Sequence, residues 1–168
     1  MQPVKILIFS DSHGKAHRVR KVLEMHRDAD MVFFLGDGMG EAELYTKEFG
    51  LRLVPVLGNC DSYTGLYSYV REEETVSLEG HRIFLAHGHR FDVKYGSSHI
   101  AAEAKKRGCD IVIYGHTHVP YSVYRPEPQG PIHIFNPGSL GEPRYGNPSY
   151  GLLILQGNSV LFSHGEVL

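Results

Sequence analysis

Residues 4–14 read VKILIFSDSHG, an apolar run that stops abruptly at polar residues and a glycine. A short apolar run bounded by turn residues is typical of a buried β-strand that leads into a loop. The same pattern occurs four more times, at residues 31–35, 53–57, 83–86 and 111–114. We therefore predict five core strands, each followed by a polar, glycine-containing loop.

Helical spacing separates several of these strands. Apolar residues recur with a period typical of helices at residues 16–26, 41–49 and 97–107, and Gly50 and Gly108 follow two of these segments as stop signals. Four further strands, at residues 120–125, 132–135, 150–155 and 159–166, are separated only by turns. The pattern predicts one α/β sandwich domain over residues 1–168, with a sheet core and helices outside.

Composition limits the possible functions and locations. The 168 residues carry 17 Lys and Arg against 19 Asp and Glu, a net charge of -2 that argues against a nucleic-acid-coating surface. Cys60 and Cys109 are the only cysteines and form neither a disulfide scaffold nor a zinc ribbon. No apolar run approaches the ~20 residues of a membrane span or the ~7–15 of a signal-peptide core. We expect a cytoplasmic protein without membrane contact.

The five polar loops contain the residue types that hold divalent metals. In open α/β sheets, ligands bind at the carboxyl ends of the strands, where these loops converge. The loops carry two carboxylates, one amide and four imidazoles, from Asp11, His13, Asp37, Asn59, His87, His116 and His118. Such oxygen and nitrogen donors suit Mn, Fe, Ni, Zn or Mg. Seven donors are more than the four ligands of one tetrahedral zinc ion, and their number suits two ions about 3.5–4 Å apart.

The spacing within two of these loops is also informative. Asp11 and His13, like His116 and His118, are two positions apart and follow a strand, where alternate side chains point the same way. We therefore expect each pair to serve one site. Any one of these residues alone would be read as an ordinary turn or surface residue, so the prediction depends on their conjunction.

The motifs DSH, GD, GNCD, HGH and GHTH, in this order, resemble the calcineurin-like metallophosphoesterase superfamily. With Asn136, Pro137, Gly138 and Ser139, the chain looks most like the small, single-domain phosphodiesterase branch. The resemblance implies a four-layered α/β/β/α sandwich and two divalent ions, manganese first, with nickel, iron, zinc or magnesium as alternatives. It also implies hydrolysis of small phosphodiesters by a hydroxide that the two metal ions activate.

The resemblance further implies a role for each residue. The first metal would be held by Asp11, His13, Asp37 and His118, and the second by Asp37, Asn59, His87 and His116. Asp37 would bridge the two. Asn59 would also orient the phosphate, and His87 or His116 would steady the transition state.

One position departs from the family pattern. Much of the superfamily has a histidine after the Gly-Asn pair as general acid, where this chain has Cys60. A thiol with a pKa near 8.5 is a poor replacement. His89 is the candidate donor, although it could instead orient His87 or lie in solvent.

Substrate contacts are less well defined by the sequence. Arg144 follows a Gly/Pro-rich loop and could bind the phosphate, although a plain turn with an exposed arginine explains it equally well. Tyr63, Tyr67 and Tyr69 could stack on a base or form a contact in a homo-oligomer, but a partly buried tyrosine cluster is the preferred interpretation.

Three alternatives to a phosphodiesterase remain at this point. The same metal site would serve a phosphomonoesterase. The fold also occurs, by resemblance, as a noncatalytic protein-binding scaffold, although every ligand position here carries a competent residue. A nuclease is disfavoured because the motif loops show no basic stripe.

Overall fold

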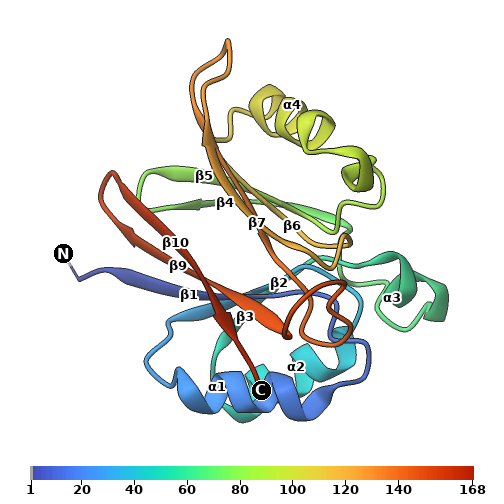
Figure 1. The fold of residues 1–168 in the computed structure, drawn as a ribbon. Helices are drawn as coiled ribbons and strands as arrows, with labels where there is room; N and C mark the ends of the chain where they lie inside the picture. Colours follow the sequence, from blue (N-terminus) through green and yellow to red (C-terminus); the bar gives the residue numbers. More distant parts are fainter. Residues whose placement is uncertain (1) are drawn as a thin grey trace.

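Four of the five apolar runs form inner strands of two five-stranded sheets that lie face to face in the computed structural model, which describes residues 2–168 (Figure 1). The run at residues 53–57, predicted as a core strand, instead contributes to a partly buried edge strand of the first sheet. The first sheet has the order β10 (Ser159–Glu166), β9 (Ser149–Gln156), β1 (Val4–Phe9), β2 (Met31–Phe34) and β3 (Arg52–Pro55). The second has the order β4 (Glu73–Leu78), β5 (His81–Ala86), β6 (Ile111–Tyr114), β8 (Ile132–Pro137) and β7 (Pro120–Arg125).

Helices cover the outer faces of both sheets. The first sheet is covered by α1 (Ala16–Met25) and α2 (Met39–Glu48), and the second by α4 (Ser98–Lys106) (Figure 1). Two short helices, α3 (Asn59–Thr64) and the 3-10 helix η1 (Val93–Tyr95), follow β3 and β5. The layers therefore run α/β/β/α, as expected, and the predicted helices agree with α1, α2 and α4 to within two residues at each end.

Strand alternation explains why the fold has layers. Along β1, Leu7 and Phe9 pack among the helices, whereas Ile6 and Ile8 pack between the two sheets. Side chains of a strand alternate between its two faces, so a strand buried on both faces must be apolar throughout. All four side chains have no exposed surface. The apolar runs are thus the consequence of a sheet covered on both sides.

Strand direction brings the loops together. β1, β2 and β3 are parallel to one another in the first sheet, as are β5 and β6 in the second. Parallel neighbours end at the same edge of a sheet, so the five polar loops meet at one end of the sandwich, as predicted.

Three elements were not predicted from the sequence: the 3-10 helix η1, the strand β4 and the helix α3. β4 mixes glutamates, threonine and serine with apolar residues, because it is an edge strand of the second sheet and only partly buried. It pairs with β5 through a two-residue turn, where Glu79 and Gly80 have φ of 51° and 84°. Positive φ at both turn residues is the geometry of tight hairpins, usually made by Asn-Gly rather than Glu-Gly. The missed helix α3 begins at Asn59, in a segment predicted as loop.

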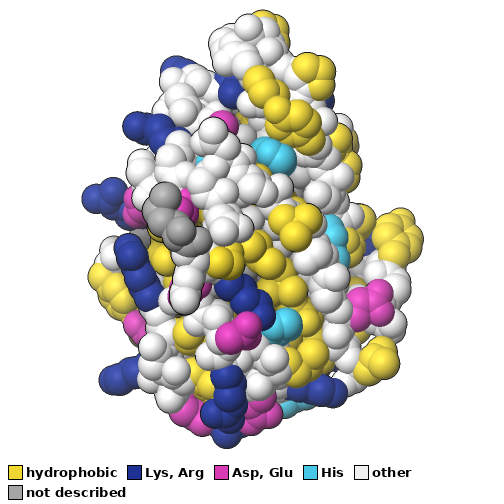
Figure 2. Space-filling model, turned by 90° about the vertical axis from the view of Figure 1, so that its left-hand side faces the viewer, with side chains coloured by type: hydrophobic (Ala, Val, Ile, Leu, Met, Phe, Trp, Pro, Cys, Tyr) yellow, Lys and Arg dark blue, Asp and Glu magenta, His cyan; other side chains and the backbone are white. Residues whose placement is uncertain are grey.

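The surface carries both signs of charge. Figure 2 shows one face on which basic and acidic side chains are interspersed, with hydrophobic side chains gathered between them. Among the helices of residues 2–168, none has the length and apolar character needed to cross a membrane.

Candidate functional site

Hydrogen bonds between the loops hold the strand ends of β1, β2, β5 and β6 together. The N–H of Asp11 donates to the carbonyl of Gly36 at 2.9 Å, which joins the loops after β1 and β2. The N–H of Gly115 donates to the carbonyl of His87 at 2.9 Å, which joins the loops after β6 and β5. The N–H of His116 donates to Asp11 Oδ2 at 3.0 Å and connects the two sheets. The predicted donors therefore share one rigid framework.

The backbone at the site is in a conformation that side chains rarely adopt. Seven non-glycine residues of the described chain have positive φ, and five of them are predicted metal ligands: Asp11, His13, Asp37, His116 and His118. A left-handed conformation costs about 1–2 kcal/mol per residue and persists only where surrounding structure enforces it. Such strain is concentrated at functional sites.

This conformation corrects one step of the sequence argument. The pairs Asp11/His13 and His116/His118 lie beyond the ends of β1 and β6, so strand alternation does not orient them. Asp11 and His13 do serve one group of donors. His116 and His118, in contrast, point to different groups.

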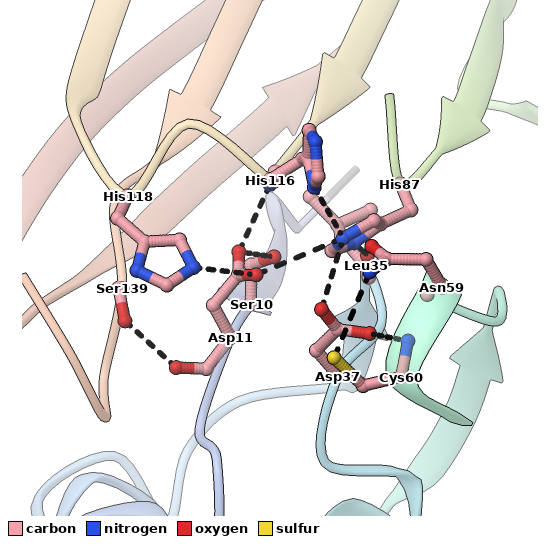
Figure 3. A network of polar contacts seen from close by, with 12 residues as sticks. Ser10, Asp11, Leu35, Asp37, Asn59, Cys60, His87, His116, His118 and Ser139 are labelled. Carbon is pink, nitrogen blue, oxygen red and sulfur yellow. Dashed lines mark hydrogen bonds and ion pairs between the residues drawn. The ribbon is translucent and has the colours of Figure 1, made fainter. Parts of the chain in front are cut away.

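The first group of donors is centred on Asp11 (Figure 3). Asp11 Oδ1 lies 3.1 Å from His118 Nε2 and 3.7 Å from His13 Nε2. The two imidazole nitrogens are 3.3 Å apart. Three ligand atoms of Asp11, His13 and His118 therefore face a common point.

The second group is centred on Asp37 (Figure 3). Asp37 Oδ2 lies 3.3 Å from His87 Nε2, and His87 Nε2 lies 3.1 Å from His116 Nδ1. The same Asp37 oxygen is 3.9 Å from His13 Nε2, which belongs to the first group. Asp37 thus lies between the two groups, where one carboxylate can serve both.

Carbonyl oxygens orient two of the imidazoles. His87 Nδ1 donates to the carbonyl of Leu35 at 2.5 Å, and His118 Nδ1 donates to the carbonyl of Glu142 at 2.6 Å. With Nδ1 as the donor, Nε2 is the nitrogen that faces the carboxylates and that a metal ion would bind once the ring is neutral. Such partners commonly fix the tautomer of metal-binding histidines.

The residues present fit divalent metal ions. Asp11 Oδ2 accepts hydrogen bonds from Ser10 Oγ and the His116 N–H, whereas buried Asp11 Oδ1 has no hydrogen bond and faces the imidazole nitrogens of His118 and His13. Asn59 Oδ1, near His87, is also buried and without a partner. Unpaired buried oxygens are costly and call for a partner such as an ion. Carboxylate, amide and imidazole donors match borderline divalent cations.

The carboxylates and imidazoles shift each other's pKa values. Burial alone would raise the pKa of Asp11, but its contacts with His118 and His13 lower it well below its usual range. Burial would also raise the pKa of Asp37, but the hydrogen bond and charge of His87 outweigh burial and lower that pKa. Burial lowers the pKa of His87, but Asp37 and Asp11 outweigh it and raise that pKa. Both carboxylates are therefore ionised at pH 7, and their negative charge favours protonation of His87.

The other three imidazoles of the site differ in the direction of their pKa shifts. The pKa of His13 and that of His118 are raised, in both cases chiefly by contact with Asp11. Burial and the neighbouring His87 lower the pKa of His116 to about 4. His116 is therefore neutral at pH 7 and ready to coordinate.

Asp61 is a functional residue that the sequence reasoning missed. Its carboxylate is 7% exposed and accepts four backbone N–H groups at 2.7–3.0 Å, from Asp37, Gly38, Met39 and Gly58. These bonds join the loop that carries Asp37 to the loop that carries Asn59. The available signal was an acidic residue three positions after Gly58, the spacing of a helix capping box.

The Gly/Pro-rich loop that precedes Arg144 is hydrogen-bonded to the loop that carries Asp11. Ser139 Oγ donates to the carbonyl of Asp11 at 2.7 Å and accepts the N–H groups of Gly141 and Glu142. This loop therefore supports the backbone of Asp11. Arg144 lies at its end, where its N–H donates to the carbonyl of His118 at 3.1 Å and its side chain is exposed.

The two candidate proton donors differ in their surroundings. Cys60 is exposed at the start of α3, but partial desolvation of its thiol and the negative charge of Asp37 raise its pKa to about 11. His89 lies beside His87, with ring centroids 5.5 Å apart, and its Nδ1 is buried without a partner. Burial and His87 lower the pKa of His89, so it is mainly neutral at pH 7. Neither group is a strong general acid in this state.

A cavity of about 450 Å³ opens beside His13, Asp37 and Cys60, with Leu44 and Tyr67 on its apolar side. A larger cavity, of about 740 Å³, lies between α2 and the segment around Tyr69, but none of the predicted donors lines it.

The predicted tyrosine cluster is only partly buried. Tyr67 is partly buried, as expected, whereas Tyr63 and Tyr69 are 90% and 66% exposed.

Comparison with known proteins agrees with this geometry. A family model described as the calcineurin-like phosphoesterase superfamily domain matches residues 4–159. The chain belongs to the calcineurin-like phosphoesterase superfamily. The phosphodiesterase YfcE of Escherichia coli K12 is 33% identical, over 89% of this chain and 87% of that protein. The family relationship makes this chain a metal-dependent phosphoesterase.

Solved structures support the fold. A predicted phosphoesterase from Streptococcus pneumoniae is 27% identical and superimposes with a TM-score of 0.78, covering 99% of this chain and 91% of that one. Vacuolar protein sorting 29 from Cryptosporidium parvum has a TM-score of 0.74, covering 98% of this chain and 99% of its own, at 19% identity. At that identity the likeness to the sorting protein is one of fold alone.

Proposed function

We propose that this chain is a phosphodiesterase that hydrolyses small phosphodiesters with two divalent metal ions, manganese being the first candidate. The position of Asp37 carries the proposal, because one of its oxygens faces His87 at 3.3 Å and His13 at 3.9 Å. A carboxylate between two nitrogen-rich groups is the arrangement that a two-metal site needs. Similarity to a protein named phosphodiesterase supports the diester rather than the monoester as substrate.

The proposed ligands follow the two groups. Asp11, His13, Asp37 and His118 would hold the first ion, and Asp37, Asn59, His87 and His116 the second. Divalent cations held there would act as Lewis acids and neutralise the charge of the phosphoryl oxygens. Nickel, iron, zinc and magnesium are the alternative metals, because the donors are oxygens and nitrogens.

The chain's own residues would then orient the substrate. Asn59, whose amide lies beside His87, would hold the phosphate, and exposed Arg144 would bind one of its oxygens as a charge-assisted donor. The cavity of about 450 Å³ is in the range that takes small ligands. Leu44 and Tyr67 on its apolar side suit a neutral ester substituent better than a second charged phosphate.

The protonation states limit which leaving groups can be used. The Cys60 thiol has a pKa of about 11 and holds its proton too tightly to be an efficient acid at pH 7. We therefore expect faster hydrolysis of diesters whose alcohol is a good leaving group. Both cysteines are free thiols, which suits the reducing environment of the cytoplasm as the proposed location.

Hydrolysis of bis-p-nitrophenyl phosphate and p-nitrophenyl phosphate by metal-stripped protein, refilled separately with manganese, nickel, magnesium or zinc, tests the proposal. We expect diester turnover that needs metal and falls at least about 1,000-fold in Asp37→Asn, which also loses bound metal. Retained turnover in that variant would contradict the site. Preference for the monoester would indicate a phosphomonoesterase, and no turnover with any metal would favour a protein-binding scaffold.

A further inference from the structure

Cys60 lies in the wall of the site without a place in the proposed reaction. Its backbone N–H donates to Asp37 Oδ1 at 2.8 Å, which anchors the residue beside that carboxylate. Its Sγ lies 3.6 Å from Asn59 Nδ2 and lines the same cavity as His13 and Asp37. Cys60, His13 and Asp37 each offer one ligand atom, and the three atoms lie within 4.8 Å of one another.

We propose that Cys60, His13 and Asp37 form a sulfur-containing donor group that takes a thiophilic divalent cation such as Zn²⁺, Co²⁺ or Cd²⁺. One sulfur, one nitrogen and one oxygen are a mixed donor set of the kind that such cations accept. The inference rests on the proposed function only in that His13 and Asp37 belong to the same site. It adds a ligand outside the oxygen and nitrogen donors already described.

The geometry permits the three atoms to meet one ion. His13 Nε2 and Asp37 Oδ2 are 3.9 Å apart. Bond lengths of about 2.3 Å to sulfur and about 2.0–2.2 Å to nitrogen or oxygen bring donors roughly 3.5 Å apart around a tetrahedral ion. The Cys60 side chain is exposed and can rotate about its single χ1 bond to close the remaining distance. On binding, the S–H bond breaks, the sulfur–metal bond forms and the proton leaves to solvent.

The thiol also predicts which metals the site prefers. Sulfur ligands favour zinc and cadmium over magnesium, which prefers oxygen. The other cysteine, Cys109, is 1% exposed in the core between the second sheet and α4, and it belongs to none of the metal-ligand groups of the described residues. Cys109 is therefore a matched control for any sulfur signal.

The test is titration of the metal-stripped full chain with Co²⁺ and Cd²⁺, with thiolate-to-metal charge-transfer absorption as the readout and bound metal measured by mass spectrometry. We expect the band in the unmodified protein and in Cys109→Ser, and its loss in Cys60→Ser. Cys60→Ser should also weaken Cd²⁺ binding about 10-fold or more, and Mg²⁺ binding less than about twofold.

Several results would overturn the inference. These are the absence of the band while Cd²⁺ is bound, failure of Cd²⁺ to bind, or a band that persists in Cys60→Ser. The outcome is separable from the proposed function, which is tested by diester hydrolysis rather than by sulfur–metal absorption. Diester hydrolysis without a sulfur band overturns only the role of Cys60, and a sulfur band without hydrolysis overturns only the phosphodiesterase.

Discussion

Asp61 accepts the backbone N–H of Asp37 at 2.7 Å, across 24 positions of the sequence. The same carboxylate accepts the N–H of Gly58 at 3.0 Å, so one buried side chain joins the loops that follow β2 and β3. Asp37 has φ of 61°, a conformation it would leave without such support. The position of the central carboxylate of the site therefore depends on Asp61, a residue that offers no donor atom to it.

The substitution Asp61→Asn tests this dependence. An amide keeps one acceptor oxygen but replaces the other with an NH₂ donor. At least one backbone N–H group would then face another donor instead of an acceptor. We expect the free energy of unfolding to fall by about 2–4 kcal/mol and Mn²⁺ affinity to fall about 10-fold or more. Urea unfolding of the metal-free chain and calorimetric titration with Mn²⁺ measure the two effects.

Asp110→Asn is the matched control for Asp61→Asn. Asp110 accepts the N–H of Arg82 at 2.9 Å and pairs with His81 at 2.6 Å, at the amino-terminal end of β5 and β6. Its substitution should lower stability without changing metal affinity. Equal losses of metal affinity in both variants would mean that Asp61 contributes only to overall stability and does not position Asp37.

Gly58→Ala should displace Asp37 by steric overlap alone. Gly58 has φ of -85° and ψ of 173°, extended backbone that alanine adopts without strain. A Cβ there would overlap the Asp37 carboxylate. We expect a loss of stability of about 1–3 kcal/mol and metal affinity too weak to measure by calorimetry. In Gly50→Ala the added Cβ meets no atom within 4 Å, although φ of 67° strains the alanine, so stability should fall while metal affinity is unchanged. Normal metal affinity in Gly58→Ala would refute the predicted displacement.

Metal affinity should rise with pH. The pKa values of His13, His87 and His118 are raised above the usual value of about 6.5, whereas a metal ion binds the neutral ring. Below the raised pKa values, binding must displace protons, and this cost disappears as pH rises through them. Calorimetry in buffers of different ionisation enthalpy should show protons released near pH 6.5 and fewer near about pH 8.5. Affinity independent of pH would contradict the ligand assignment.

The metal-free chain should show the opposite trend over the same range. The raised pKa values of these histidines contribute stability that is present below about pH 6.5 and lost as pH rises through them. The lowered pKa of His116 contributes stability that is lost as pH falls from about 6.5 to about 4, and the lowered pKa values of Asp11 and Asp37 contribute stability that is lost below about 4. Thermal melts without metal should therefore show greatest stability at about pH 6.5, and added Mn²⁺ should move the optimum upward.

Arg144→Ala tests the proposed contact with the phosphate. The N–H that Arg144 donates to His118 belongs to the backbone and survives the substitution. We expect KM for bis-p-nitrophenyl phosphate to rise about 10-fold, with kcat within about twofold and stability within about 0.5 kcal/mol. Arg20→Ala is the control, because Arg20 lies on α1 and pairs with Glu24 and Glu48. An unchanged KM in Arg144→Ala would mean that the side chain only faces solvent.

Several features of this protein could be predicted from local sequence. The run from Val4 to Phe9 is apolar at every buried position, and such a short run bounded by turn residues is typical of a strand covered on both faces. The donor types of the site are likewise visible, because each motif combines them with glycine at the end of a strand. The edge strand β4 was not predictable in this way, because half-buried residues carry a weak pattern.

The sequence by itself therefore determined which residues approach the site, but not how they face one another. His116 and His118 illustrate the difference, since two positions of spacing predicted a shared direction and the structure sends them to Asp37 and Asp11 respectively. Their directions depend on left-handed backbone that is maintained by hydrogen bonds between loops distant in the sequence. Apolar periodicity is a local property of the chain, whereas these dihedral angles are stable only in the assembled sandwich, so only the tertiary structure could decide them.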